Sequence, residues 1–348
     1  MAHRLVKRSR VGEVDFRNID FGKVYSDHMF VADYVDGRWQ NFSIVPYEQI
    51  HLLPGTAILH YAQSVFEGLK AYRGRNGEVF VFRPEMNARR LNKSSERMCI
   101  PELPEDIFME GMDELLRVDK AWIPDLPGTS LYIRPFIFAV DEYIGIRPSD
   151  KDKFMIFTCP VGAYYSKPVR VKIETHFSRT VAGGTGFAKA GGNYAASLYP
   201  AKIAKKEGYD QLIWTDGQTH KYIEEAGTMN LMFIIDDVLI TAETGDTILE
   251  GITRDSVITL AKDWGQKLEI RKITVEEILD ALEKGRIQEA FGVGTAATVA
   301  HIDVIGFEGR DYSLPEIDEN FFSRRVAREL DGIKTGRIED KFGWNHTV

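Results

Sequence analysis

The sequence predicts a mixed α/β (α+β) fold in two domains, and three observations lead to this prediction. The chain has 348 residues, which corresponds to about two domains of ~150 residues each. Strand-like and helix-like segments follow one another without strict alternation, which disfavours a doubly wound parallel sheet. In the segment GAYYSKP, tyrosine, glycine and proline replace the apolar runs on either side. We therefore expect a smaller N-terminal α/β domain over residues 1–161, a linker over 162–168 and a larger C-terminal α/β domain over 169–348.

The N-terminal part is expected to begin with β-hairpins. Asp36-Gly37 and Asn76-Gly77 each lie between strand-like runs and suit a type I′ turn. After Pro84 the apolar residues take a helical spacing, and a second helix is expected from about residue 105 to 120. The apolar segments SLYIRPFIFAVDEYIG and KFMIFTCPVG are typical of strands covered on both faces.

The C-terminal part is expected to mix strands with helices. Strands are predicted at VRVKIETHF, QLIWTD, TMNLMFIIDDVLIT and IQEAFGVG. Helices are predicted from about residue 194 to 207, from 254 to 265 and from 275 to 283. A glycine-rich stretch, VAGGTGFAKAGGN, separates the first of these strands from the first helix.

Composition and charge exclude several classes of function. Lys and Arg number 44 and Asp and Glu number 52, so the net charge is −8, which disfavours nucleic acid and anionic membrane surfaces as partners. No run approaches the ~18 apolar residues of a membrane span. The eight histidines show no HExxH spacing and no CxxC pair exists, so we expect no metal site. A hydrolase with a GxSxG nucleophile elbow is also disfavoured, because that motif is missing.

Cysteine usage and the N-terminus predict the compartment. Cys99 and Cys159 are too few for a disulfide framework. The basic start has no apolar segment of the kind a secretory signal needs. An organellar transit peptide stays open, although Glu13 and Asp15 come early for one. We expect a cytoplasmic protein of a reducing compartment.

Lys189, in GGTGFAKAGGNY, is the strongest local candidate for chemistry. Five glycines surround it and small residues flank it, which permits close approach of a ligand to the backbone. The segment is either a flexible loop with a solvated lysine or the site of a lysine that forms a Schiff base with an aldehyde cofactor. It is not a P-loop, because Ala188 and Ala190 replace the glycine and the Ser or Thr of that motif.

Three further segments carry weaker signals. In IEEAGTMN, Glu224 and Glu225 either end a strand in solvent or supply a carboxylate for a cationic ring nitrogen. Gly251-Ile252-Thr253 leads into a helix, whose N-terminus is suited to an anion. Residues 292–297 (GVGTAA) fit GxGxxG/A formally, but too little chain follows for a dinucleotide fold. A tight turn that offers amides to an anion is the better interpretation.

Taken together in their order, these segments resemble the branched-chain amino-acid aminotransferases, which are fold-type IV pyridoxal-phosphate enzymes. The resemblance rests on YVDGRW, SVFEGLKAYR, LYIRP, CPVGAYY, KAGGNYAASL, EEAGTMN, GITRDS and GVGTAATV. It implies the two-domain fold-type IV architecture, with the active site at the domain interface. Vertebrate members carry a CxxC after the GTA turn, whereas this chain has Ala297 and Ala300 there, so a redox switch of that kind is not expected.

The resemblance also implies roles for individual residues. Lys189 looks like the Schiff-base lysine, Tyr194 like the phenol on the ring oxygen of the cofactor, and Glu225, rather than Glu224, like the carboxylate on the pyridine nitrogen. The residues implied to hold the cofactor phosphate are Arg90, Ile252, Thr253 and Thr295. Those implied to bind substrate are Phe66, Tyr132, Arg134, Tyr164, Thr228, Thr295 and Ala296, together with Tyr61, Ile144 and Ile146 from the partner subunit of a homodimer.

The implied function is transamination of leucine, isoleucine or valine with 2-oxoglutarate, which gives the branched 2-oxo acids and L-glutamate. The implied cofactor is pyridoxal 5′-phosphate (PLP), and the mechanism is ping-pong, with Lys189 as general acid and base. A D-amino-acid aminotransferase or an aminodeoxychorismate lyase of the same fold remains an alternative. A nicotinamide-dependent oxidoreductase or a non-catalytic binding module is a more distant one. The sequence does not decide which branched substrate is preferred or whether the role is biosynthetic.

Overall fold

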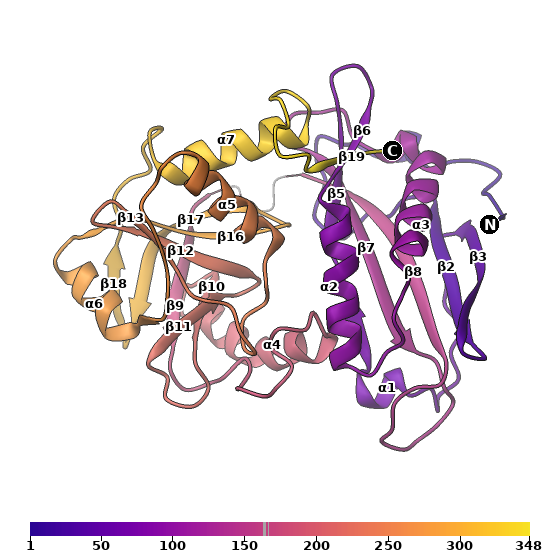
Figure 1. Cartoon of the computed structure of the whole chain (residues 1–348), viewed down its shortest axis with the longest axis horizontal. Coiled ribbons are helices and arrows are strands. Elements are labelled where there is room, and N and C mark those ends of the chain that lie inside the picture. The colour runs from indigo at the N-terminus through magenta and orange to yellow at the C-terminus, as the bar shows by residue number, and fades with distance from the viewer. Residues whose placement is uncertain (163–164, 166) are drawn as a thin grey trace. The chain divides into compact units, whose positions relative to one another are not determined.

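The computed structural model describes residues 1–162, 165 and 167–348 (Figure 1). The chain divides into two compact units whose segments are interleaved along the sequence. Unit 1 comprises Met1–Tyr164, Ala188–Gly192 and Asp331–Val348, and unit 2 comprises Tyr165–Phe187 and Asn193–Leu330. The domain and linker boundaries expected from the sequence stay a prediction, because Ala163, Tyr164 and Ser166 lie outside the described residues.

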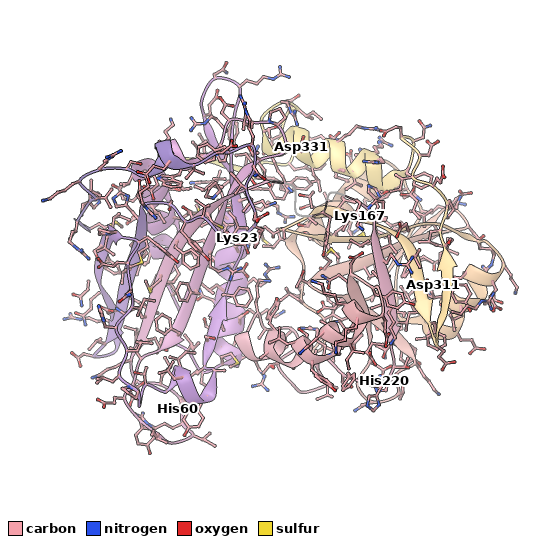
Figure 2. All side chains as sticks on the ribbon, turned by 180° about the vertical axis from the view of Figure 1, so that it is seen from behind. Lys23, His60, Lys167, His220, Asp311 and Asp331 are labelled. Atoms are coloured by element: carbon pink, nitrogen blue, oxygen red, sulfur yellow. The ribbon has the colours of Figure 1, made fainter. Side chains whose placement is uncertain are left out.

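Unit 1 is built on a nine-stranded sheet in the order β1-β3-β2-β8-β7-β5-β6-β19, with β4 paired to β7. Its strands are β1 (Ala2–His3), β2 (His28–Val35), β3 (Arg38–Pro46), β4 (Ser64–Phe66), β5 (Leu69–Arg73), β6 (Val79–Phe82), β7 (Ser130–Ala139), β8 (Asp152–Val161) and β19 (Asn345–Thr347). Its helices are α1 (Ile58–Tyr61), α2 (Pro84–Arg97) and α3 (Glu105–Val118), with the 3₁₀ turns η1 (Val11–Glu13) and η2 (Lys120–Trp122). The single turn α1 carries His60, which Figure 2 labels. The His60 ring forms a 2.8 Å hydrogen bond with the carbonyl of Pro54.

The two predicted hairpin turns have different outcomes. Asp36 and Gly37 both have positive φ, 55° and 76°, and Val35 pairs with Arg38, so the type I′ turn is confirmed. The hairpin predicted around Asn76-Gly77 is confirmed, because β5 and β6 pair antiparallel with Arg73 opposite Val79. The type I′ turn predicted there is wrong, because a five-residue loop connects these strands and Asn76 does not have a positive φ. The Glu78 carboxylate accepts bonds from the backbone and side chain of Asn76, each 3.0 Å long, and these bonds stabilise the longer loop.

Helices α2 and α3 pack against the sheet of unit 1 around one apolar core. Phe30 of β2, Phe108 of α3 and Phe154 of β8 have no exposed surface, and the Phe154 ring contacts the rings of the other two. At Gly111 an added Cβ would lie 2.8 Å from the Phe30 ring. Only glycine lets α3 approach β2 this closely.

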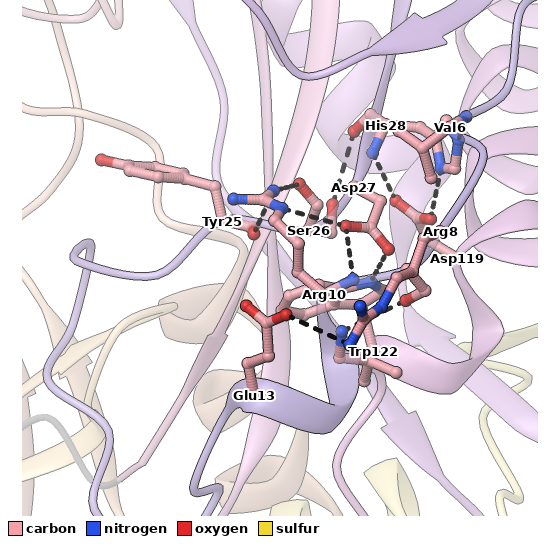
Figure 3. A network of polar contacts seen from close by, with 12 residues as sticks. Val6, Arg8, Arg10, Glu13, Tyr25, Ser26, Asp27, His28, Asp119 and Trp122 are labelled. Atoms are coloured by element: carbon pink, nitrogen blue, oxygen red, sulfur yellow. Dashed lines mark hydrogen bonds and ion pairs between the residues drawn. The ribbon is translucent and has the colours of Figure 1, made fainter.

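A network of hydrogen bonds and ion pairs connects the N-terminal segment to the rest of unit 1 (Figure 3). Arg10 Nε lies 3.1 Å from Asp27 Oδ1, and the Trp122 indole donates to Asp27 Oδ2 at 2.9 Å. The buried His28 ring lies 2.7 Å from Asp119 Oδ1, and its other nitrogen accepts the amide of Val6 at 3.0 Å. Because these carboxylates are buried, their partners offset the cost of removing them from water.

Unit 2 contains a ten-stranded sheet in the order β14-β13-β12-β16-β17-β9-β10-β11-β15, with β18 paired to β17. Its strands are β9 (Val169–Glu174), β10 (Gln211–Thr215), β11 (Tyr222–Ala226), β12 (Met229–Ile235), β13 (Val238–Thr241), β14 (Leu268–Ile270), β15 (Ile273–Thr274), β16 (Ile287–Gly294), β17 (Thr298–Phe307) and β18 (Arg310–Ser313). The helices are α4 (Gly191–Lys206), α5 (Ile252–Asp263), α6 (Val275–Glu283) and α7 (Phe322–Lys334), of which α4 and α7 cross the unit boundaries.

Local chemistry explains where several elements of unit 2 begin and end. Asp236 and Asp237 have positive φ, 49° and 63°, and form a tight turn between β12 and β13. The Thr274 hydroxyl accepts the Glu277 amide at 3.0 Å and caps α6. The Glu289 carboxylate accepts the amides of Phe322 and Ser323 and so satisfies the N-terminus of α7. Among the described residues, no helix is both long and apolar enough to cross a bilayer.

Candidate active site

Lys189 lies in unit 1, where hydrogen bonds hold its backbone on both sides. Its amide donates to Ser94 Oγ of α2 at 2.9 Å, and its carbonyl accepts the Phe66 amide at 3.0 Å. Ala190 forms a β-bridge with Val65. The side chain is half-buried, and its Nζ lies 4.9 Å from the centre of the Phe66 ring. Lys189 is therefore fixed next to β4, although the surrounding sequence suggested a flexible loop as one possibility.

Arg90 projects from α2 onto a buried carboxylate that sequence reasoning missed. Its Nε donates to Glu67 Oε1 at 2.7 Å and its Nη2 to Oε2 at 2.8 Å, in the bidentate geometry that guanidinium and carboxylate favour. Asn87 adds a third bond to Glu67, at 2.7 Å. Glu67 stands in SVFEGLKAYR with no local spacing that would distinguish it from a surface residue.

The surroundings of Glu67 keep its carboxyl ionised. Burial alone raises the pKa of this group, but the charge and hydrogen bonds of Arg90, the charge of Lys189 and the amide of Asn87 together hold the pKa of Glu67 below its ordinary value. The carboxylate thus links electrostatically the two cationic residues of unit 1 that the sequence singled out.

One face of the unit 1 sheet combines aromatic rings with a guanidinium. Tyr132 and Arg134 are two residues apart on β7 and share one face of the sheet, as predicted. Arg134 Nη2 donates to Tyr132 Oη at 3.0 Å. The guanidinium carbon lies 4.7 Å from the Phe66 ring centre and 5.3 Å from that of Tyr132. Arg134 Nε is buried and has no hydrogen-bond partner among the described residues. This face offers an apolar wall with an unsatisfied donor, and an added Cβ at Gly68 would overlap the Tyr132 hydroxyl.

Two further polar residues share this face. Tyr132 pairs with Lys70 on one side and with Cys159 on the other, so the three side chains form a row across β5, β7 and β8. Burial lowers the pKa of Lys70 to about 8 and raises the pKa of Cys159 to about 11. No local pattern in the sequence marked either residue as part of this face.

Unit 2 has a cavity that brings together three of the predicted residues, Tyr194, Glu225 and Thr228. Its lining consists of Arg179, Asn193, Tyr194, Ser197, Glu225, Gly227, Thr228, Met229, Asn230 and Leu249. Tyr194 comes from α4, which begins at Gly191, three residues before the predicted start. Glu225 comes from β11, and Thr228 from the turn that follows that strand.

Arg179 accompanies Glu225 in this cavity and was not recognised in the sequence. Its Nε lies 2.7 Å from Glu225 Oε1 as an ion pair, but the N–H does not point at the oxygen, so Nε makes no hydrogen bond within the described chain. Nη2 of Arg179 donates to the carbonyls of Gly186 and Thr247, at 2.9 and 2.8 Å. These bonds anchor the guanidinium, and the Leu249 amide donates to Glu225 Oε2 at 3.3 Å.

Glu224 has different surroundings, although it is the next residue on the same strand. Its carboxylate accepts a 2.5 Å bond from Thr247 Oγ1 and does not line the cavity. Burial raises the pKa of Glu224, although the Thr247 bond and the charge of Arg179 act in the opposite direction. Because successive residues of a strand face opposite sides, β11 presents only one of the two carboxylates to the cavity.

The predicted anion-binding segments are also in unit 2. Helix α5 begins at Ile252, two residues before its predicted start, and its N-cap Gly251 supplies no side-chain cap. The amides of Ile252 and Thr253 therefore belong to the first turn, which has no preceding helical carbonyls as partners. An added Cβ at Gly251 would overlap Asn230 Oδ1, so this close approach requires glycine.

Thr295 and Ala296 lie in the turn between β16 and β17. These strands pair antiparallel, with Gly294 opposite Thr298, so the segment is a hairpin and not the strand-to-helix turn of a dinucleotide fold. An added Cβ at Gly294 would lie 3.4 Å from the carbonyl of Thr228. The turn therefore lies beside one of the residues that line the cavity.

The remaining predicted residues stand apart from these groups. Tyr61, Ile144 and Ile146 are 38%, 71% and 94% exposed, on segments of unit 1 around α1 and between β7 and β8. Tyr164 lies outside the described residues.

Comparison with known proteins gives a consistent set of relatives. Residues 64–305 match the family described as Amino-transferase class IV. Branched-chain-amino-acid aminotransferase 2 of Bacillus subtilis (strain 168) is 43% identical over 338 residues, which cover 96% of this chain and 93% of that protein. The branched-chain-amino-acid aminotransferase of Mycolicibacterium smegmatis is 41% identical over 343 residues, with coverage of 96% and 93%.

Solved structures of similar fold carry the same description. The branched-chain amino acid aminotransferase of Escherichia coli superposes with a TM-score of 0.75 at 29% identity, covering 92% of this chain and 98% of that one. The branched-chain aminotransferase of the thermophilic archaeon Thermoproteus uzoniensis, solved with norvaline, gives a TM-score of 0.76 at 27% identity, with coverage of 92% and 99%. The mixed α/β fold predicted from the sequence matches that of these structures.

Proposed function

The chain belongs to the class IV aminotransferase family, and we propose that it transfers the amino group of leucine, isoleucine or valine to 2-oxoglutarate with PLP as cofactor. The observation that carries the substrate assignment is the face of unit 1 on which the Arg134 guanidinium lies over Phe66 and Tyr132. An aminotransferase for these substrates must accept both an aliphatic side chain and a carboxylate. The aromatic wall suits the first and the half-buried guanidinium of Arg134 suits the second.

The donor sets of the two units, each taken by itself, fit PLP. Unit 1 offers a fixed lysine, Lys189, and a buried guanidinium, Arg90, which suit an aldehyde and a phosphate. Unit 2 offers the buried carboxylate of Glu225, lining a cavity with Tyr194, and the uncapped start of α5, which suit a pyridinium ring and an anion. PLP, when bound, withdraws electrons from the substrate Cα so that its proton can be removed.

We assign the following actions to the chain's own residues. Lys189 Nζ would hold the cofactor aldehyde and serve as base and acid for the substrate proton. Glu225 would face the ring nitrogen, and the anchored Arg179 holds the Glu225 carboxylate in place. Tyr194 Oη would donate to the ring oxygen. For the phosphate, unit 1 would supply the Arg90 guanidinium, and unit 2 would supply the amides of Ile252 and Thr253 together with Thr295.

Substrate binding is divided among groups of different chemistry. The amides of Thr295 and Ala296 hold the α-carboxylate, as a tight turn with exposed amides is suited to do. For the aliphatic side chain, unit 1 would supply Phe66 and Tyr132, and unit 2 would supply Thr228; the predicted Tyr164 lies outside the described residues. Arg134 binds the side-chain carboxylate of glutamate or 2-oxoglutarate.

We also propose that the protein is a homodimer. Exposed apolar side chains gather on two segments of unit 1, Ile50, Leu53, Leu59 and Tyr61 on one and Tyr143, Ile144 and Ile146 on the other. The Ala57 amide donates to the carbonyl of Asp141 at 2.8 Å and joins the two segments. We call these seven residues the apolar patch. A patch of this kind on a water-exposed surface indicates a protein interface, and a second copy of the chain is the partner we propose.

A cytoplasmic location is also part of this proposal. Cys99 is exposed and Cys159 buried, and both are free thiols. An exposed free thiol suits a reducing compartment.

Two measurements on the purified protein test the proposed function. A panel of L- and D-amino acids with 2-oxoglutarate should show turnover with L-leucine, L-isoleucine and L-valine, and the visible band at ~410–420 nm should bleach with L-glutamate. Borohydride reduction followed by mass spectrometry should place a pyridoxyl group on Lys189. Turnover of D-amino acids alone, lyase activity on aminodeoxychorismate, or a pyridoxyl group on Lys70 would overturn the assignment.

A further inference from the structure

Glu67 has no exposed surface and lies in unit 1 between β4 and β5. Both of its carboxylate oxygens accept hydrogen bonds, Oε1 from Arg90 Nε and Oε2 from Arg90 Nη2 and Asn87 Nδ2, at 2.7 to 2.8 Å. Removing a carboxylate from water is costly, and only good partners offset that cost. A buried pair of this geometry therefore fixes the guanidinium plane, which an exposed ion pair does not do.

Helix α2 connects this pair to Lys189. Asn87, Arg90 and Ser94 follow a helical spacing of three and four residues, and all three are buried. Ser94 Oγ accepts the amide of Lys189 and donates to the carbonyl of Arg90, each at 2.9 Å. One face of one helix thus positions the two residues that the proposed function places on the phosphate and on the aldehyde carbon of the cofactor.

We propose, building on the function proposed above, that Glu67 is a positioning residue that holds the Arg90 guanidinium ready for the cofactor phosphate and keeps a negative charge beside Lys189. A guanidinium fixed before binding loses little rotational freedom when the phosphate arrives. The negative charge of Glu67 also interacts electrostatically with the positive charge of Lys189. Glu67 contacts no reacting atom in this role and acts through Arg90 and Lys189.

The test compares two ligands that differ only in the phosphate. The full-length chain is freed of cofactor and titrated with PLP and with pyridoxal, for the wild type, Glu67→Gln and the control Glu105→Gln. Glu105, at the start of α3, accepts a 3.1 Å hydrogen bond from Nε of Arg89, the neighbour of Arg90 on α2. This ion pair is exposed to solvent, so the control removes a nearby ion pair of ordinary strength. We expect Glu67→Gln to raise the Kd for PLP at least about tenfold and the Kd for pyridoxal less than about threefold. Glu105→Gln should change neither.

A double variant shows whether Glu67 acts through Arg90. On an Arg90→Lys background, Glu67→Gln should weaken PLP binding by less than about threefold further, since the bidentate partner is already lost. If Glu67→Gln does not fold, Glu67→Asp takes its place, with a smaller loss expected for PLP alone.

Other results would contradict either the role of Glu67 or the proposed function, and the two cases can be distinguished. Equal losses for PLP and pyridoxal, or additive losses in the double variant, would show that Glu67 is merely structural. A wild-type chain that binds no PLP would instead overturn the proposed function itself.

Discussion

Glu224 and Glu225 are neighbours on β11, yet their surroundings differ. Glu225 lines the cavity of unit 2 and lies 2.7 Å from Arg179, whereas Glu224 is bonded to Thr247 and its pKa is raised, chiefly by burial. A carboxylate that must stay charged opposite a pyridinium needs a cation beside it. The surroundings of Glu225 meet this condition.

We expect Glu225→Gln to lower kcat about 100-fold, because an amide cannot stabilise a protonated ring nitrogen. Glu224→Gln is the matched control and should lose far less, since the amide oxygen still accepts the Thr247 bond. Steady-state kinetics with leucine and 2-oxoglutarate measure both. A larger loss at Glu224 would show that the wrong carboxylate had been chosen.

Arg134→Leu should separate the two substrate classes. Its buried Nε has no hydrogen-bond partner in the described chain, and the substitution leaves the rings of Phe66 and Tyr132 available to an aliphatic side chain. The half-reaction with glutamate should lose about 2–4 kcal/mol of transition-state stabilisation, as for a buried carboxylate without its partner. The half-reaction with leucine should fall much less. Stopped-flow absorbance of the two half-reactions decides, and parallel losses would mean that Arg134 is structural.

At the scale of elements, the loop between β7 and β8 carries Ile144 and Ile146 and ends at a buried acid. Asp152 has no exposed surface, and burial, with the nearby carboxylates of Asp141 and Asp150, raises its pKa to about 7. Ser149 donates to Asp152 Oδ1 at 2.8 Å and lowers that pKa only in part. Arg147 lies 3.6 Å from Asp141 and also pairs with Asp150, so the arginine compensates these carboxylates rather than Asp152.

The raised pKa of Asp152 predicts a pH-dependent stability. Between about pH 4 and pH 7 the folded chain holds a proton that the unfolded chain releases, so the free energy of unfolding falls as pH rises through this window. Asp152→Asn removes this dependence, and the variant should gain up to a few kcal/mol over the wild type at about pH 8 but little at about pH 4. Urea unfolding at both pH values measures the difference. Asp125→Asn, at an exposed position distant in sequence from this loop, is the control, and a pH-independent difference would contradict the prediction.

At the scale of the whole molecule, the chain leaves unit 2 to place five residues in unit 1. Ala188–Gly192 belong to unit 1 because Ala190 pairs with Val65 and the Lys189 backbone is bonded to Ser94 and Phe66. The apolar patch, by contrast, is left open to solvent by the described part of its own chain. Its side chains include Ile146, which at 94% is the most exposed large hydrophobic residue that the structure describes.

Ile146→Asp should shift the assembly from dimer to monomer, because a charge in a buried apolar interface loses its hydration without a partner. Light scattering coupled to gel filtration measures the mass. Ile270→Asp, at a 42% exposed position in unit 2, is the control and should leave the mass unchanged. A wild type that is monomeric at all concentrations would contradict the proposed homodimer.

The sequence by itself determined the elements whose signals are local. The turn at Asp36-Gly37, the helix that starts at Pro84 and the alternation of Tyr132 and Arg134 were predictable, because each depends on residues within a few positions of one another. The glycines around Lys189 and the two neighbouring glutamates also identified the segments in which to look for chemistry. The turn at Asn76-Gly77 failed because the side chain of Glu78 favoured a longer loop.

Only the tertiary structure decided which groups meet. Arg90 and Glu67 are 23 residues apart in the chain, and Arg179 is still farther from Glu225, so no periodicity or spacing predicts either ion pair. The structure likewise decided that Glu225, and not Glu224, lines the cavity of unit 2. Partners of this kind are set by sheet register and helix packing, which join distant segments, and burial then determines the charge that each group carries.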